Sequence, residues 1–127
     1  MSTPNPVRVL IADDSDLFAS ALTAVLSREE GIEVVGTAEN GAVALKLARE
    51  LRPHVVLMDI SMPVLDGFEA TELITAQLDG VCVLMVTGSA AEADIRRARV
   101  AGASGYVTKE RINEILVDKI KEVAGGC

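Results

Sequence analysis

VVLMDISMPVLDG, residues 55–67, is the stretch that decides the fold of this chain. It begins with a short apolar run of the length and residue type that form a buried strand, and this run ends at Asp59. A loop follows, and Asp66 and Glu69 at its end have the spacing of a helix capping box. The stretch therefore predicts a buried strand that ends in a carboxylate, followed by a helix that begins near Gly67.

Similar runs recur along the chain on both sides of this stretch. Apolar runs rich in β-branched residues lie at 7–12, 32–37, 55–59, 81–87 and 105–108. The segments between them have apolar residues at helical spacing, and Ser89 with Glu92 predicts a helix start near Ala90. Strict alternation with short connections requires right-handed crossovers and a parallel sheet covered on both faces. We therefore predict an α/β fold, a doubly wound (βα)5 domain with a five-stranded parallel sheet.

Length and composition fit a single folded unit. The chain has 127 residues, of which half are hydrophobic but only 2% are aromatic, so we expect an aliphatic core. The formal net charge of -7 argues against a surface that binds nucleic-acid phosphates. We expect residues 1–127 to form one domain with an ordered core over about 7–124, and frayed ends at 1–6 and 125–127.

Cysteine usage and hydropathy indicate the cellular setting. Cys82 and Cys127 offer neither a disulfide framework nor metal-ligand spacing, and Cys82 is expected to be a small buried hydrophobic side chain. The chain start lacks the pattern of a signal peptide, and no apolar run approaches the roughly 20 residues that span a bilayer. We expect a reduced, soluble, cytoplasmic protein that does not bind membranes.

Polar side chains gather where the predicted strands end, and ligands bind at this edge of an open parallel sheet. Asp13 and Asp14 follow the first strand, Asp59 ends the third, Thr87 ends the fourth, and Lys109 follows the fifth. Carboxylates crowded together repel one another, which raises their pKa values unless a cation joins them. Oxygen ligands indicate a hard divalent ion, and Mg2+ fits best because it needs few protein ligands and accepts phosphoryl oxygens.

These segments resemble the receiver domains of two-component response regulators, over about residues 7–123. The resemblance rests on VLIADDS (9–15), VVLMDISMPVLDG (55–67), VTGSA (86–90) and AGASGYVTK (101–109). It implies the flavodoxin-like strand order 2-1-3-4-5. It also implies a signalling module that is not an enzyme for an external substrate, because it catalyses only its own phosphorylation and dephosphorylation.

The resemblance also assigns roles around the acidic residues. Asp59 would accept a phosphoryl group from a sensor histidine kinase. Asp13 and Asp14 would bind Mg2+ together with Asp59 and the backbone carbonyl of Ser61. Asp66 is instead interpreted as a helix cap, because its capping-box partner lies three residues further on.

Further roles fall at the ends of the fourth and fifth strands. Thr87 and Lys109 would hold the phosphoryl oxygens, and Tyr106 matches the switch aromatic of the family, although a lone aromatic in a strand can simply fill the sheet edge. Phosphorylation would then change the surface of the fourth helix, fifth strand and fifth helix. Many family members have proline after the lysine, but this chain has Glu110, so a trans peptide bond is expected there.

Three segments indicate a class within the family. GIEVVGTAENG, LRPHVVLMDISMP and AGASGYVTKE resemble receivers of the NarL/FixJ class, whose chains usually continue into a LuxR-type helix-turn-helix domain. We therefore expect the receiver portion of a two-domain transcription regulator, with a C-terminal DNA-binding domain absent from this chain. DNA would be bound only through that domain, and phosphorylation would promote homodimers. A stand-alone receiver that docks on a partner protein is the alternative.

Two other functions share parts of this pattern. A Mg2+-dependent phosphatase of the aspartyl-phosphate type also uses a nucleophilic carboxylate, but it normally needs that residue on the first strand and a capping element. A nucleotide-binding module would need a glycine-rich phosphate loop, whereas the first turn here reads ADDSD. Both fit the sequence less well than a receiver domain.

Overall fold

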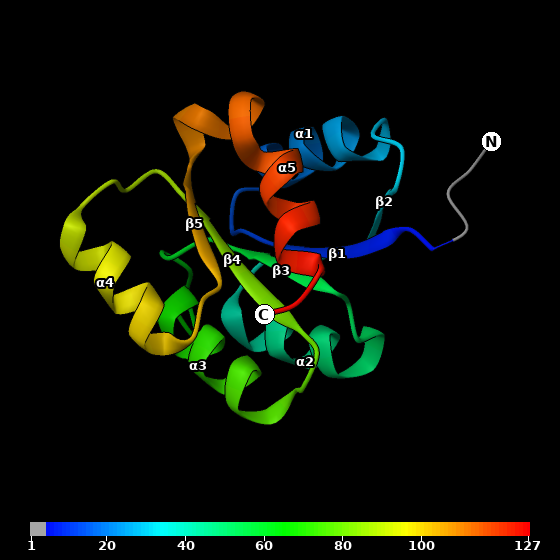
Figure 1. Cartoon of the computed structure of the whole chain (residues 1–127). Coiled ribbons are helices and arrows are strands. Elements are labelled where there is room, and N and C mark those ends of the chain that lie inside the picture. Colours follow the sequence, from blue (N-terminus) through cyan, green and yellow to red (C-terminus); the bar gives the residue numbers. More distant parts are fainter. Residues whose placement is uncertain (1–4) are drawn as a thin grey trace.

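Strands and helices alternate along residues 5–127, the part of the chain that this computed structural model describes (Figure 1). The strands are β1 (Val7–Ala12), β2 (Ile32–Ala38), β3 (Val55–Met58), β4 (Cys82–Thr87) and β5 (Gly105–Thr108). The helices are α1 (Asp16–Ser27), α2 (Gly41–Leu51), α3 (Gly67–Gln77), α4 (Glu92–Ala101) and α5 (Ile112–Ala124), with a 3-10 turn, η1 (Lys109–Arg111), before α5. All strand pairs are parallel, and the order β2-β1-β3-β4-β5 confirms the predicted α/β fold.

Two layers of helices enclose the sheet. Helices α1 and α5 cover one face, and α2, α3 and α4 cover the other (Figure 1). Successive side chains of β1 serve the two cores in turn: Val9 and Ile11 pack under α1 and α5, whereas Leu10 and Ala12 pack toward the other layer. Phe68 is the only aromatic side chain among the buried residues of the described chain, so the predicted aliphatic core is confirmed.

The predicted element boundaries agree with the structure to within a residue for the strands and for α3. The runs at 7–12 and 105–108 match β1 and β5, whereas β3 stops at Met58 and leaves Asp59 just beyond it. Helix α3 begins at Gly67 as predicted, because the Asp66 carboxylate accepts the backbone N–H of Glu69 at 2.9 Å. The interpretation of Asp66 as a helix cap is therefore confirmed.

The predicted start of α4 was wrong. This helix begins at Glu92, and Ala91 at its N-cap provides no side-chain hydrogen bond. The Ser89 hydroxyl instead accepts the N–H of Ala91 at 3.2 Å and donates to the Asp94 carboxylate at 2.6 Å. A serine oxygen that bonds a backbone N–H two residues on forms a local turn, and this turn replaces the expected capping box.

The prediction about the cysteines was also wrong. Cys82 is buried, as expected, but it forms a disulfide with Cys127, and the two Cα atoms lie 5.6 Å apart. Helix α5 packs along the sheet and brings the end of the chain back to the start of β4, a proximity that the separation of 45 residues does not reveal. The expected frayed end at 125–127 is thus tethered. Of the expected frayed start at 1–6, residues 1–4 lie outside the described residues.

Two further expectations concern the backbone and the membrane. No peptide bond in residues 5–127 is cis, so the bond between Lys109 and Glu110 is trans, as expected. Among the same residues, no helix combines the length and the apolar character needed to cross a bilayer.

The disulfide leads to a prediction about stability. Reduction of the bond between Cys82 and Cys127 is expected to lower the free energy of unfolding by about 4 kcal/mol, because a loop of this size then regains its entropy in the unfolded chain. Urea unfolding with and without dithiothreitol measures the change. Cys127→Ser should match the reduced protein and be insensitive to reductant. Equal urea midpoints for the oxidised and reduced protein would contradict the prediction.

Candidate functional site

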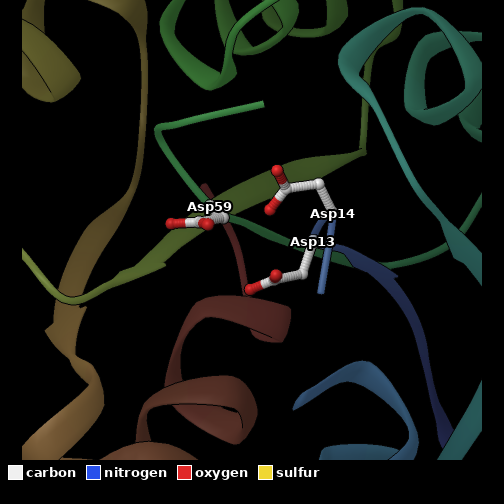
Figure 2. A group of neighbouring side chains, drawn as sticks. All are labelled: Asp13, Asp14 and Asp59. Carbon is white, nitrogen blue, oxygen red and sulfur yellow. The ribbon is translucent and has the colours of Figure 1, made fainter. Parts of the chain in front are cut away.

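Three carboxylates meet at the carboxyl edge of the sheet (Figure 2). Asp13 and Asp14 follow β1 and Asp59 follows β3, and the register that pairs Ala12 with Met58 brings the two strand ends together. One oxygen of each carboxylate lies within 4.8 Å of the others. Asp13 and Asp59 are buried, and Asp14 is exposed. Such a set of anionic oxygens fits a hard cation that keeps part of its water shell, as Mg2+ does.

Both oxygens of the Asp13 carboxylate are engaged. Oδ2 accepts from the Lys109 ammonium at 2.9 Å, and Oδ1 accepts the backbone N–H of Ser15 at the same distance. The Asp13 side chain is only 2% exposed, so the carboxylate of this ion pair is shielded from solvent, whereas the Lys109 side chain is 28% exposed. The predicted juxtaposition of Asp13 with Lys109 is therefore present in the structure.

The two oxygens of the Asp59 carboxylate have different partners. Its Oδ1 accepts the backbone N–H of Ile60 at 2.9 Å, while Oδ2 faces the Lys109 ammonium at 3.7 Å. Burial raises the pKa of Asp59 above its ordinary value, and the charge of Asp13 raises it further, while Lys109 opposes both effects. The repulsion between carboxylates that the sequence predicts thus contributes to the raised pKa of Asp59. Oδ2 is the oxygen that points toward the fixed cation.

Helix α3 returns very close to the backbone of Asp59. A Cβ atom on Gly67 would lie 2.0 Å from the Asp59 carbonyl oxygen, so only glycine fits there. The Gly67 N–H donates to the Ile60 carbonyl at 2.8 Å and fixes this approach. The glycine after the Asp66 cap therefore helps to hold the end of β3 in place.

The loop between β3 and α3 contains a strained turn. The Leu65 N–H donates to the Pro63 carbonyl at 2.8 Å, and Val64 between them has φ 69° and an 82% exposed side chain. A β-branched residue rarely adopts positive φ, and such a conformation persists only where the surrounding structure imposes it. This tight turn lets the chain reverse within a few residues of Asp59.

Thr87 and Tyr106 extend from the site toward α4. Thr87 is buried at the end of β4, and its hydroxyl acts to lower the pKa of Asp59. Tyr106 in β5 is half-buried against the core under α2, α3 and α4, and its hydroxyl donates to the Ser89 carbonyl at 2.8 Å. Burial also raises the pKa of this phenol. The predicted switch residue therefore bonds directly to the segment that leads from Thr87 to α4.

Ser61 belongs to the predicted site, whereas Phe18 does not. Ser61 lies exposed in the loop after Asp59, and the role of its carbonyl stays a prediction. Sequence reasoning did not single out Phe18, whose ring centre lies 4.0 Å from the Lys109 ammonium. The signal available in the sequence was its place in the first turn of the helix that follows the acidic pair, but that place does not show which way the ring points.

A family model described as the response regulator receiver domain matches residues 9–121. This chain belongs to that family. The receiver domains of the family use Mg2+ at an acidic pocket, and the carboxylates of Asp13, Asp14 and Asp59 provide such a pocket here.

Curated relatives include both long and short proteins. The chain is 41% identical over 120 residues to the transcriptional regulatory protein LnrK of Bacillus subtilis (strain 168), covering 94% of this chain and 54% of LnrK. It is 38% identical over 116 residues to the chemotaxis protein CheY of Halobacterium salinarum (strain ATCC 29341 / DSM 671 / R1), covering 91% of this chain and 95% of that protein. The chain thus spans about half the length of regulators such as LnrK.

Solved structures of response regulators share the fold of this chain. The signal receiver domain of the putative response regulator NarL from Mycobacterium tuberculosis superimposes with a TM-score of 0.92 at 31% identity, covering 98% of this chain and all of that domain. A LuxR-family response regulator from Staphylococcus aureus superimposes with a TM-score of 0.87 at 30% identity, covering 93% and 98% of the two chains. The fold and the resemblance to NarL- and LuxR-type receivers are thereby confirmed.

The environment of Asp59 predicts how stability depends on pH. A carboxyl whose pKa is raised in the folded state favours folding below its unfolded pKa, near 3.8, and this contribution is lost as the pH rises through the folded pKa. In Mg2+-free buffer at pH 7, Asp59→Asn is therefore expected to have a higher free energy of unfolding than the wild type. The difference should vanish below about pH 3.8.

Urea unfolding at a series of pH values, with EDTA present, measures this difference. Asp118→Asn, which neutralises an exposed carboxylate on α5, is the matched control and should not reproduce the effect. A stability of Asp59→Asn equal to that of the wild type at pH 7 would contradict the prediction.

Proposed function

We propose that this receiver domain accepts a phosphoryl group on Asp59 from a sensor histidine kinase, and that the phosphorylation state of Asp59 controls transcription. The observation that supports this function most directly is the placement of Asp59 Oδ2. This oxygen faces the Lys109 ammonium at 3.7 Å, beside Asp13 and Asp14, while Oδ1 is engaged by the N–H of Ile60.

The chemistry follows from that placement. Oδ2 of Asp59 attacks the phosphorus of a phosphohistidine, the new O–P bond forms as the N–P bond breaks, and the departing imidazole nitrogen takes a proton. Phosphoryl transfer depends mainly on alignment and on fixed positive charge at the equatorial oxygens, and Lys109 provides such a charge. Mg2+ bound by Asp13, Asp14, Asp59 and the Ser61 carbonyl would neutralise the remaining negative charge. Hydrolysis of the acyl phosphate returns the carboxylate, so the domain acts only on itself.

Phosphorylation is proposed to reach a distant surface through Thr87 and Tyr106. A phosphoryl group on Asp59 would attract the Thr87 hydroxyl, and Tyr106 would turn further inward. Because Tyr106 bonds to the Ser89 carbonyl, such a movement would bias the segment before α4. The affected surface would comprise α4, β5 and α5, where a second copy or another partner could bind.

We further propose that this domain belongs to a cytoplasmic two-domain transcription regulator. The similarity to LnrK, of which it spans 54%, supports this proposal. A net charge of -7 disfavours DNA binding by this domain itself, so a helix-turn-helix domain would supply that activity. The coverage of 95% of the Halobacterium CheY supports a stand-alone receiver as the second candidate. The length of the natural reading frame distinguishes the two.

The first test of this function uses a small phosphodonor. With Mg2+ and acetyl phosphate, the wild type is expected to gain one phosphoryl group, seen by intact-mass analysis. Asp59→Asn should remain unmodified, because it lacks the nucleophile. The same adduct on Asp59→Asn would contradict the assignment, and sustained turnover of a phosphate monoester by the wild type would favour a phosphatase instead.

The second test addresses the metal. Asp13→Ala or Asp14→Ala is expected to weaken Mg2+ binding at least tenfold and to slow phosphorylation, since each change removes a carboxylate from the cluster. Asp66→Ala is the control, because it should cost about 1 kcal/mol of stability as a lost helix cap and leave Mg2+ affinity unchanged. Isothermal titration with MgCl2 measures the affinities. Equal affinity in all three variants would contradict the division of roles.

A further inference from the structure

A closed ring of contacts links Lys109 to the start of α1. The Lys109 ammonium donates to Oδ2 of Asp13, and Oδ1 of Asp13 accepts the N–H of Ser15. The Ser15 hydroxyl accepts the N–H of Phe18 at 3.2 Å as the N-cap of α1. The Phe18 ring closes the circuit, because its centre lies 4.0 Å from the Lys109 ammonium. The same carboxylate thus orients both the cation and, through the cap, the ring that faces it.

The Phe18 ring can restrict the movement of the Lys109 ammonium, which the bond to Asp13 alone does not. A lysine side chain is long and flexible, and that of Lys109 is 28% exposed, so the single bond to Asp13 leaves it freedom to turn toward water. The negative face of an aromatic ring attracts an ammonium and shields one side of it from solvent. Between Phe18 and Asp13, the ammonium lies 3.7 Å from Asp59 Oδ2.

We propose that Phe18 is a positioning residue for Lys109: its ring holds the ammonium beside the oxygen of Asp59 that accepts the phosphoryl group. This role rests on the proposed function, because it matters only if Asp59 is phosphorylated. In this role Phe18 acts on the phosphoryl transfer through Lys109 alone.

Packing is the other role that Phe18 can fill. Its side chain is half-buried and lies against the core under α1 and α5, so a large change there would also disturb that core. The two roles differ in what they require of the ring. Packing depends on its volume, whereas the attraction to Lys109 depends on the negative charge of its face, which fluorine atoms withdraw while the volume changes little.

The decisive experiment is a fluorination series at position 18. Phenylalanine carrying one, two or three ring fluorines is incorporated at Phe18 alone, and the rate constant for phosphorylation by acetyl phosphate with Mg2+ is measured. The logarithm of the rate constant is expected to fall steadily with each fluorine. Phe18→Leu is expected to be about three- to tenfold slower than the wild type, and Phe18→Tyr, which keeps the aromatic face, is expected to stay within about twofold.

Phe68 provides the matched control. It is the other phenylalanine of the chain, and its ring faces the guanidinium of Arg97 at 4.3 Å rather than Lys109. The same fluorinated residues at position 68 should leave the rate constant unchanged. Thermal unfolding of every variant checks that the fold persists.

A spectroscopic measurement reports the contact without phosphorylation. In the wild type, NMR should show the side-chain protons of Lys109 shifted upfield by the ring current of Phe18, and this shift should be lost in Phe18→Leu. Absence of the shift in the wild type overturns the proposal.

The rates separate the remaining outcomes. A wild type that is phosphorylated normally, but whose rate is flat across the fluorinated series at Phe18, overturns the role of Phe18 alone. A wild type that acetyl phosphate does not modify overturns the proposed function, and the positioning role falls with it.

Discussion

The ion pair between Lys109 and Asp13 is the interaction on which the rest of the site depends. Two buried carboxylates, Asp13 and Asp59, lie beside a third at one edge of the sheet, and burial of like charges is costly. The ammonium, 2.9 Å from Asp13 and 3.7 Å from Asp59, offsets part of that cost. It does not remove it, since the pKa of Asp59 is still raised. The site is thus left with an affinity for additional positive charge.

The fold delivers this arrangement because parallel strands bring their carboxyl ends to one edge. Strands β1 and β3 are neighbours at the centre of the sheet, so the acidic pair and Asp59 meet through hydrogen-bonded backbone. Lys109 is the first residue of η1, directly after the edge strand β5, and its side chain reaches inward to Asp13. The ring of Phe18 in α1 faces its ammonium, with the ring centre at 4.0 Å. The paired strand ends therefore position the carboxylates, and the long side chain of Lys109 brings the positive charge to them.

Bonds at the two ends of β4 hold the segment that contains α4, β5 and α5. Tyr106 links β5 to the segment before α4 through the Ser89 carbonyl, and Ser89 itself is bonded to Asp94 at the start of that helix. At the opposite end of β4, the disulfide of Cys82 and Cys127 closes the loop that contains α4, β5 and α5. The proposed signalling surface thus lies between a hydrogen-bonded connection near the site and a covalent bond far from it.

The sequence by itself determined the strands, the start of α3 and the acidic site, because each rests on local signals. Buried parallel strands are continuous apolar runs, and a helix cap lies three residues from its partner. Residues that follow neighbouring parallel strands meet at one edge of the sheet. Tertiary structure alone decided the disulfide, the contact of Phe18 with Lys109 and the positive φ of Val64. The first two join residues far apart in the chain, where side-chain direction depends on how helices pack. The third is a conformation that a β-branched residue adopts only when the surrounding fold imposes it.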